Sequence, residues 1–264
     1  MTPANTPDTP AGTGAGRGGG GGDLCDLIVI AKEPVPGRVK TRLTPPYTPE
    51  QAALLAEAAL TDTLDTAVAA RTVRRRTLAL AGRPGPWLPP GFAVVPQRGD
   101  GLDERIAAAF DDAHRAAEHA AGPRPLVLIG MDTPQLTPAL LDGAARALTG
   151  SDAVIGPASD GGFWLLGLRR PDAALLRGVP MSRPDTGHLQ LGRLRAAGLT
   201  VAILPELTDV DTAEDAAAVA ASAPDGRFAF ALRALHTTPR ASRRAVAAVA
   251  PPGGRGGALR EATA

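Results

Sequence analysis

LCDLIVIAKEPVPGRVKTRL, residues 24–43, joins an apolar run to a basic loop. Residues 24–31 are almost continuously apolar, which is typical of a strand that is buried on both faces of a sheet. The loop that follows holds Lys32 and Lys40, the two lysines of the chain, whereas all other long basic side chains are arginines. This stretch predicts a buried parallel strand that carries a basic loop to the edge of a sheet.

Five more strand-like runs follow this first one. They are RTLALAG (76–82), FAVVPQ (92–97), PLVLIGMD (125–132), DAVIGP (152–157) and TVAILPE (200–206). Helical patterns lie between most of them, which implies parallel strands joined by right-handed crossovers. We therefore expect a three-layer α/β fold with a mostly parallel central sheet. FWLLGLRR (163–170) indicates either a hairpin partner of DAVIGP or an added strand that makes the sheet mixed.

The composition limits the possible functions. The chain has 264 residues, 44% of them hydrophobic, and a net charge of +1. Without a long block of one charge in the body, neither a nucleic acid nor an anionic membrane is indicated as a partner. The single Cys25 cannot form an internal disulfide, and no Cys/His cluster has zinc spacing. No membrane-length apolar run and no secretory signal are visible, so we expect a cytoplasmic protein; its oligomeric state cannot be read from the sequence.

The two ends differ in composition from the middle. Residues 1–22 are rich in Gly, Pro and Thr, and residues 236–264 in Ala, Pro, Gly and Arg. Such segments bury little apolar surface, so we expect both to be disordered tails. Residues 23–235 are then one folded domain. RFAFALRAL (227–235) is compatible with a last helix at its end.

Polar loops follow several of the predicted strands. In open α/β sheets the ligand lies beyond the carboxyl ends of the strands, so these loops should meet at one edge. They are the basic loop 31–43, QRGDGLDER (97–105), MDTPQL (131–136), SDGG (159–162) and LTDVDTAED (207–215).

The basic loop fits a phosphate chain. Gly37 allows a sharp turn and a close approach of the backbone to a ligand. Lys32, Arg38, Lys40 and Arg42 place four cations within eleven residues. Lysine is a compact point charge, whereas arginine prefers planar, bidentate contacts, so the retained lysines indicate a need for an ammonium. The alternative is that two lysines share a solvated loop by chance; the P-loop pattern is absent.

Two acidic loops suggest a divalent cation. Asp132 follows an apolar strand directly and would be a hard ligand for Mg²⁺ or Mn²⁺. The alternative role, a helix N-cap, is better filled by Thr137. Asp209 and Asp211 alternate with Val210, so both carboxylates should point the same way on an extended backbone. Asp211 is our ligand candidate.

The other two loops offer weaker candidates. Asp160 could orient or deprotonate an acceptor hydroxyl, and Gly161 and Gly162 would permit close approach of that acceptor. A plain Asp-Gly hairpin turn explains the same residues. In residues 97–105, Gln97 could bind a base edge, Gly99 allows close packing, and Arg105 lies one turn into the helix.

Taken in order, these segments resemble the rSAM/selenodomain-associated transferase family, a domain of unknown function in the nucleotide-diphospho-sugar transferase (GT-A) superfamily. The shared segments are AKEPVPGRVKTRL, QRGDGLDER, GMDTPQL, GPASDGGFWLLGL and DVDTAED, and the resemblance spans about residues 28–220. Phosphoenolpyruvate and phospholactate guanylyltransferases look more distantly similar through the K-[ST]-R-L and D-V-D-T elements.

The chain departs from the family pattern in two places. Met181, Ser182 and Arg183 stand where the family usually reads W-S-T, and Phe163 and Trp164 stand where tyrosines are common. Both departures bear on the acceptor more than on the nucleotide.

The resemblance implies a Rossmann-like GT-A fold and roles for named residues. Lys32, Lys40 and Arg42 would contact the nucleotide phosphates, together with Gly37, Gln97, Gly99 and Arg105. Asp132 and Asp211 would hold Mg²⁺ or Mn²⁺. Asp160, Gly161, Gly162 and Ser182 would face the acceptor, with Asp160 and Lys40 as catalytic residues.

The implied function is that of a metal-dependent, nucleotide-using transferase. Glycosyl transfer from a nucleotide-sugar to a small acceptor comes first. A nucleotidyltransferase that acts on a small phosphorylated acceptor is the alternative. A non-catalytic nucleotide-sugar-binding protein on the same fold is a third possibility, because fold alone does not determine function.

Overall fold

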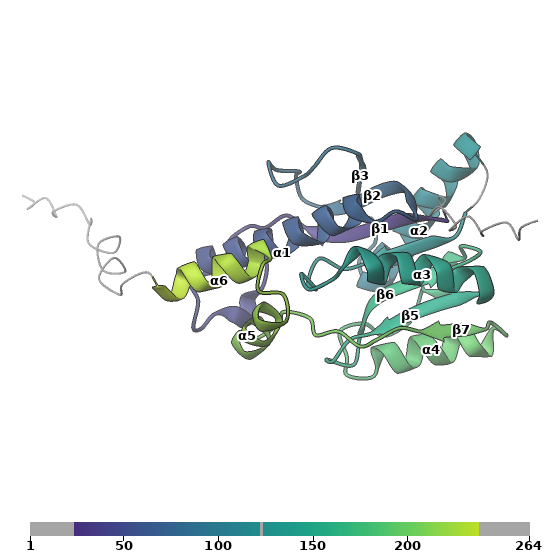
Figure 1. The fold of residues 1–264 in the computed structure, drawn as a ribbon. Helices are drawn as coiled ribbons and strands as arrows, with labels where there is room; N and C mark the ends of the chain where they lie inside the picture. Colours follow the sequence, from purple (N-terminus) through teal and green to yellow (C-terminus); the bar gives the residue numbers. More distant parts are fainter. Residues whose placement is uncertain (1–23, 122–123, 238–264) are drawn as a thin grey trace, which may run out of the picture.

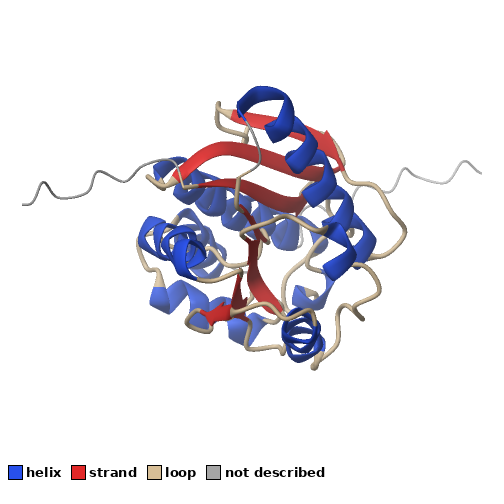
Figure 2. Ribbon diagram, turned by 90° about the vertical axis from the view of Figure 1, so that its right-hand side faces the viewer, coloured by secondary structure: helices blue, strands red, loops and turns tan. Residues whose placement is uncertain are grey.

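The computed structural model describes residues 24–121 and 124–237. The predictions for residues 1–22 and 238–264 lie outside these ranges. A central sheet separates two layers of helices (Figures 1 and 2). Within the described residues, no helix is both long and apolar enough to cross a membrane.

The sheet has seven strands in the order β3-β2-β1-β4-β6-β5-β7. β6 pairs antiparallel with β4 and β5, and all other pairs are parallel. This confirms the predicted α/β class with a mostly parallel, mixed sheet. Both expectations for residues 163–170 hold, since β6 is the hairpin partner of β5 and also a strand inserted beside β4. The strands are β1 (Cys25–Lys32), β2 (Val73–Ala81), β3 (Phe92–Pro96), β4 (Leu126–Ile129), β5 (Ala153–Pro157), β6 (Phe163–Leu168) and β7 (Val201–Ile203).

The helices begin where side chains can cap them. Thr48 and Thr212 form capping boxes with Gln51 and Asp215, and Thr137 caps the helix that starts at Pro138. Each cap satisfies backbone N–H groups that have no partner within the helix. The helices are α1 (Pro49–Ala69), α2 (Leu102–Ala121), α3 (Pro138–Gly150), α4 (Thr186–Ala196), α5 (Ala213–Ser222) and α6 (Arg227–Thr237), with short 3-10 turns η1 (Thr41–Leu43) and η2 (Ala173–Leu175).

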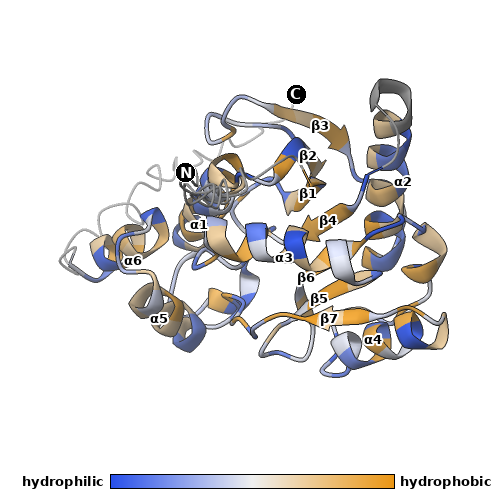
Figure 3. Ribbon diagram, turned by 45° about the vertical axis from the view of Figure 1, so that its right-hand side comes forward, coloured by the Kyte–Doolittle hydropathy of each residue, from blue (hydrophilic) through white to orange (hydrophobic). Residues whose placement is uncertain are grey.

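Both faces of the sheet are covered by helices. Leu27 and Val29 of β1 belong to the core that α1 and α3 share with the sheet. Ile28 points to the opposite face and packs in the core that includes Phe110 of α2 and Leu194 of α4. Apolar residues accordingly concentrate on the inner surfaces in Figure 3. Alternate residues of β1 therefore enter two cores, which explains its continuous apolar sequence.

A third core lies beside the sheet, where α5 and α6 pack against α1. The hydroxyl of Tyr47 lies 3.0 Å from Nε2 of His236, and the two rings are stacked. Asp62 in α1 accepts hydrogen bonds from the backbone N–H groups of Arg227 and Phe228 at the start of α6. α6 continues to Thr237, two residues beyond the end that we predicted for the folded domain. His236, beyond the predicted end, stacks on Tyr47. A contact between residues this far apart in the sequence cannot be read from the composition of the last segment.

Candidate active site

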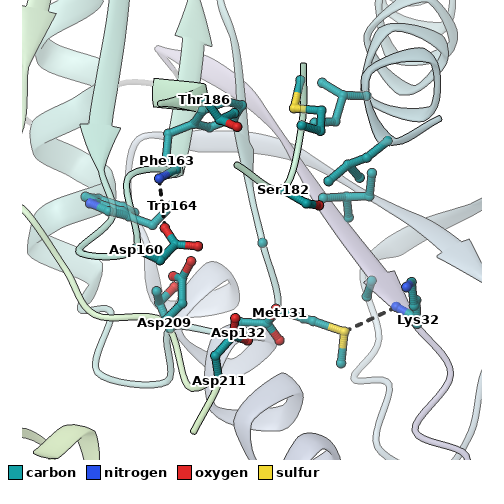
Figure 4. A pocket seen from close by; sticks show the side chains of 18 of the residues that line it. Lys32, Met131, Asp132, Asp160, Phe163, Trp164, Ser182, Thr186, Asp209 and Asp211 are labelled. Carbon is teal, nitrogen blue, oxygen red and sulfur yellow. Dashed lines mark hydrogen bonds between the residues drawn. The ribbon is translucent and has the colours of Figure 1, made fainter. Parts of the chain in front are cut away.

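A cavity of about 700 Å³ lies at the carboxyl ends of β1 and β4 (Figure 4). It therefore occupies the edge of the sheet where the polar loops were expected to meet. Three of the predicted site residues, Gly37, Gly99 and Gly161, do not line it. The predicted residues that do are Lys32, Lys40, Arg42, Gln97, Arg105, Asp132, Asp160, Gly162, Ser182 and Asp211.

Backbone contacts hold the two acidic loops together. The N–H of Val210 donates to the carbonyl of Asp132 at 3.0 Å, and the side-chain amide of Gln135 donates to the carbonyl of Thr208 at 2.7 Å. Val210 is buried in the third core. Its neighbours Asp209 and Asp211 consequently both line the cavity, in agreement with the predicted alternation.

Lys40 places its ammonium between the two predicted metal ligands. Nζ lies 2.9 Å from Oδ1 of Asp132 and 3.2 Å from Oδ1 of Asp211, and only 8% of the side chain is exposed. Burial lowers the pKa of Lys40, but the charges and hydrogen bonds of Asp132 and Asp211 outweigh it and raise that pKa above its usual value. In this structure Lys40 is thus a partner of carboxylates, which the sequence had not indicated.

The backbone at Lys40 is unusual as well. Its φ of 47° and ψ of 41° lie in the left-handed region, which a residue with a side chain seldom occupies. Lys40 also precedes η1, and its carbonyl accepts a hydrogen bond from Leu43, which is fully buried. A strained backbone at a cavity is an observation that points to function.

Arg42 adds a second, more exposed contact to Asp211. Its Nη1 lies 3.0 Å from Oδ2 of Asp211, while 72% of the arginine side chain is exposed. Both oxygens of Asp211 are therefore engaged, one by Lys40 and the other by Arg42. The exposed pair is screened by water, so the buried contact of Lys40 is the stronger of the two.

Lys32 contrasts with Lys40. Lys32 lies at the end of β1, where it is exposed and lines the cavity. The backbone N–H of Lys32 lies 3.2 Å from the sulfur of Met131, but its ammonium has no ion pair with any residue in the described ranges (Figure 4). Lys32 therefore supplies an ammonium that a ligand in the cavity can reach.

Comparison with known proteins agrees with this arrangement. Residues 54–183 match the family model described as "Uncharacterized protein conserved in bacteria (DUF2064)". Together with the crystal structure described next, this match confirms the predicted resemblance to the nucleotide-diphospho-sugar transferase superfamily. No curated protein matches the chain.

A crystal structure from Desulfovibrio desulfuricans G20 supports the same assignment. That protein, provisionally assigned as a nucleotide-diphospho-sugar transferase, is 27% identical to this chain. The match covers 81% of this chain and 96% of the other, with a TM-score of 0.72.

Two further solved structures are less similar. CMP:2-keto-3-deoxy-manno-octonic acid synthetase in complex with CTP is 13% identical, covering 76% of this chain and 98% of the other at a TM-score of 0.48. Rv0371c from Mycobacterium tuberculosis H37Rv in complex with manganese is 20% identical, covering 74% and 97% at a TM-score of 0.44. At these TM-scores the two likenesses carry no conclusion about the reaction of this protein.

Asp209 is a further carboxyl group on the cavity wall, which the sequence analysis did not choose as a ligand candidate. Burial and the charges of Asp132, Asp160 and Asp211 raise its pKa to about 7, and Lys40 opposes this effect. The alternation of Asp209 with Asp211 was the available signal, and it places two carboxylates rather than one on the cavity wall. Four carboxyl groups, those of Asp132, Asp160, Asp209 and Asp211, therefore line the cavity together with the Lys40 ammonium.

In the loop after β3, the side chains of Gln97 and Arg105, which we predicted to bind the ligand, form hydrogen bonds with the backbone. The side-chain amide of Gln97 donates to the carbonyls of Ala31 and Ala79, so its two N–H groups are engaged by the backbone. The guanidinium of Arg105 donates to the carbonyls of Gly99 and Asp100. Gly99 has a φ of 115°, and a Cβ there would lie 2.5 Å from Glu104. Gln97 and Arg105 line the cavity, whereas Gly99 serves the packing of the loop on α2.

On the predicted acceptor side, Asp160 and Gly162 line the cavity and Gly161 does not. Oδ1 of Asp160 accepts a hydrogen bond from the N–H of Gly162 at 2.8 Å. Gly161 has a φ of 88°, and a Cβ there would lie 1.9 Å from the carbonyl oxygen of Pro184. Its own carbonyl accepts a hydrogen bond from Gly187 at 2.8 Å. Gly161 therefore joins this turn to the start of α4 instead of facing an acceptor.

Phe163 and Trp164 both line the cavity, but they differ in burial. Trp164 is 2% exposed, and its indole N–H donates to the carbonyl of Pro205 at 3.0 Å. Gly156 lies under the ring, where a Cβ would be 2.4 Å from it. Phe163 is only partly buried and lines the cavity. Trp164 thus mainly packs in the core. Phe163 is the position at which the hydroxyl of a tyrosine could have contacted an acceptor.

The donor atoms fit a hard divalent cation. Oδ1 of Asp132 and Oδ1 of Asp211 converge on one cation, the Lys40 ammonium. The hydroxyl of Thr133 is buried and has no hydrogen-bond partner among the described residues, and Thr133 lines the cavity. Among the described residues no three His, Cys, Asp or Glu side chains form a metal site. Mg²⁺ is commonly held by one or two carboxylates together with ligand phosphates, which matches this set.

Proposed function

We propose that this protein is a divalent-metal-dependent transferase that acts on a nucleotide, with glycosyl transfer from a nucleotide-sugar as the first candidate. The observation that carries the proposal is the division of charge in the cavity. Lys32 and Arg105 contribute cations to its lining, whereas Asp132 and Asp211 contribute carboxylates. A diphosphate bridged to a metal ion needs both kinds of group. The 27% identical nucleotide-diphospho-sugar transferase homologue points to the same class.

In this proposal the residues have distinct roles. Lys32 binds the phosphates of the donor, and Asp132 and Asp211 hold Mg²⁺ or Mn²⁺, which would stabilise the charge of the leaving diphosphate. The bond between the anomeric carbon and the phosphate oxygen breaks, and an acceptor hydroxyl forms the new bond to that carbon. Asp160 takes the proton of the hydroxyl with Oδ2, which has no hydrogen-bond partner among the described residues. Gly162, Ser182 and Phe163 surround the acceptor.

Nucleotidyl transfer is the second candidate. The two elements that resemble guanylyltransferases, KTRL (40–43) and DVDT (209–212), are in direct contact through the ion pairs of Lys40 and Arg42 with Asp211. In that reaction the acceptor phosphate would attack the α-phosphorus of a nucleoside triphosphate, and pyrophosphate would leave. The two candidates use the same wall of the cavity but break different bonds.

The experiment combines a binding panel with product analysis. Thermal shifts are measured with nucleoside triphosphates and nucleotide-sugars, with and without Mn²⁺, and the products of the ligands that bind are identified by mass spectrometry. A nucleoside diphosphate as product supports glycosyl transfer, and pyrophosphate supports nucleotidyl transfer. Tight binding without either product would overturn the transferase proposal in favour of a binding protein. The variant Asp132→Asn should fold and lose the response to Mn²⁺.

A further inference from the structure

Lys40 occupies the point at which a divalent cation would be bound. Its Nζ is within 2.9 Å of Asp132 and 3.2 Å of Asp211, and these distances involve the Oδ1 atom of each carboxylate. A Mg²⁺ ion held by these carboxylates would need oxygen ligands at about 2.0–2.1 Å. An ammonium and a divalent ion cannot share that point, because each would lie within the contact distance of the other and like charges repel.

The side chain can leave while the loop stays in place. Val39 and Leu43, on either side of Lys40, are buried in two different cores. The carbonyl of Lys40 is held by the N–H of Leu43 at 2.9 Å. Lysine has a flexible four-carbon stem, so rotation about its side-chain bonds moves the ammonium without moving the backbone. The cavity that Lys40 lines provides room for the displaced group.

We propose that Lys40 is an internal cation that neutralises Asp132 and Asp211 in the metal-free protein and is displaced into the cavity when a divalent ion binds between them. The inference rests on the proposed function in one respect, namely that these carboxylates bind a divalent ion. The displaced ammonium then becomes available to phosphate oxygens. The metal ion and the phosphate contact of Lys40 would therefore appear together, so that a donor nucleotide and the metal ion bind cooperatively.

The composition of the chain allows a direct test, because Lys32 and Lys40 are its two lysines. The full-length protein is treated briefly with N-acetoxysuccinimide, with and without Mn²⁺, and acetylation of each lysine is quantified by peptide mass spectrometry. Binding of Mn²⁺ to the same sample is followed by electron paramagnetic resonance. Lys32 serves as the internal reference, since it is exposed and has no ion pair with a described residue.

Without Mn²⁺, Lys32 should react and Lys40 should be protected. Bound Mn²⁺ should accelerate acetylation of Lys40 by about tenfold or more relative to Lys32, because two ion pairs are then broken. If Mn²⁺ binds and Lys40 remains protected, the proposed displacement of Lys40 is wrong, whereas the proposed metal site is not contradicted. If the resonance shows no Mn²⁺ binding, the metal dependence in the proposed function and the displacement both fail.

A variant provides an independent measurement. Lys40→Met removes the competing ammonium and keeps a side chain of similar length. The variant should therefore bind Mn²⁺ about tenfold more tightly than the natural chain. Arg38→Met removes a charge from the same loop without a carboxylate contact among the described residues, and should change the affinity by less than about twofold at physiological salt. An equal or lower Mn²⁺ affinity of Lys40→Met would overturn the proposal. If Lys40→Met does not fold, the acetylation experiment on the natural chain still decides.

Discussion

The Nζ of Lys40 lies 2.9 Å from Oδ1 of Asp132, an ion pair that joins the loop after β1 to the loop after β4. The two partners differ in environment, since 8% of the lysine side chain is exposed but 38% of the aspartate side chain. A buried ammonium is tolerated only when it is paired. Asp132 therefore has a structural role in the metal-free protein besides its proposed role as a ligand.

Lys40→Arg should be damaging although the charge is kept. A guanidinium is larger and planar, and it cannot take the place of a compact ammonium between two carboxylate oxygens in a nearly buried position. We expect a lower melting temperature and a loss of nucleotide affinity of about ten- to a hundredfold in Mn²⁺, equivalent to about 1.5–3 kcal/mol for one charge-assisted contact. Calorimetric titration and thermal denaturation measure the two effects.

Arg38→Lys is the matched control for this substitution. Arg38 lies on the same loop, is exposed and makes no ion pair within the described residues, so the exchange should be mild. Full nucleotide affinity together with an unchanged melting temperature in Lys40→Arg would mean that the ammonium is not required at this position.

The sequence predicted which loops meet at the cavity, but it did not predict the ion pairs that their side chains form. The apolar runs place the carboxyl ends of the strands at one edge, and this brings Lys32, Asp132 and Asp211 to one cavity. Which lysine is paired could not be read, because it depends on how the loops after β4 and β7 approach Lys40 in three dimensions. The raised pKa of Asp209 could not be read for a related reason, since its cause is burial together with charges that are distant in the sequence.

Glycines were the least predictable of the candidates. Gly37, Gly99 and Gly161 all have positive φ, a backbone conformation that favours glycine. A pattern of glycines does not tell whether a ligand or another part of the chain lies against the turn. At Gly99 and Gly161 the close neighbour is the chain itself.

Gly161→Ala should destabilise the fold strongly. The added Cβ would lie 1.9 Å from a carbonyl oxygen of Pro184, and the φ of 88° is unfavourable for alanine. We expect a loss of more than about 2 kcal/mol in the free energy of unfolding, measured by urea denaturation. Gly37→Ala is the control, because its φ of 74° is also unfavourable, but apart from its chain neighbours no atom of the described residues lies within 4 Å of the new Cβ. A cost of about 1 kcal/mol is expected there. Equal losses in the two variants would contradict the assignment of Gly161 to packing.

Asp142 should make the stability of the protein depend on acidic pH. Its Oδ1 accepts hydrogen bonds from the N–H groups of Arg71 and Thr72 and from the hydroxyl of Thr72, which ties α3 to the turn between α1 and β2. Burial raises the pKa of this carboxyl, but the hydrogen bonds outweigh it and hold the pKa below its usual value. The carboxylate thus stabilises the fold above the unfolded-state pKa of about 3.9, and this contribution is lost as the pH falls through the lower folded-state pKa.

Asp142→Ala should therefore cost about 1–3 kcal/mol at neutral pH, and the difference from the natural chain should shrink below about pH 4. Asp225→Ala provides the comparison, since Asp225 is exposed and has no hydrogen bond or ion pair with another described residue. Unfolding followed by circular dichroism at several pH values measures both. A constant difference across this range would show that the carboxylate charge is not what stabilises the turn.

Lys32→Met should weaken nucleotide binding and leave the stability of the fold unchanged. Lys40→Arg, in contrast, should lower the stability as well. The Lys32 side chain is exposed at the end of β1, and its ammonium has no ion pair with a described residue, so its removal breaks no contact of the folded chain. In the cavity the ammonium would form charge-assisted hydrogen bonds to phosphate oxygens. Losing them should reduce the affinity for a nucleoside diphosphate by about tenfold or more, and the remaining affinity should depend less on salt.

Calorimetric titration at two salt concentrations measures this loss, and thermal denaturation confirms that the variant is folded. Arg105→Met is the informative comparison, because Arg105 also lines the cavity but its guanidinium already donates to the carbonyls of Gly99 and Asp100. That variant should lose stability as well as affinity, since two backbone carbonyls lose their donors. Unchanged nucleotide affinity in Lys32→Met, with the salt dependence of the natural chain, would place the phosphates elsewhere. The exposed lysine at the end of β1 would then be a solvated residue without a function in binding.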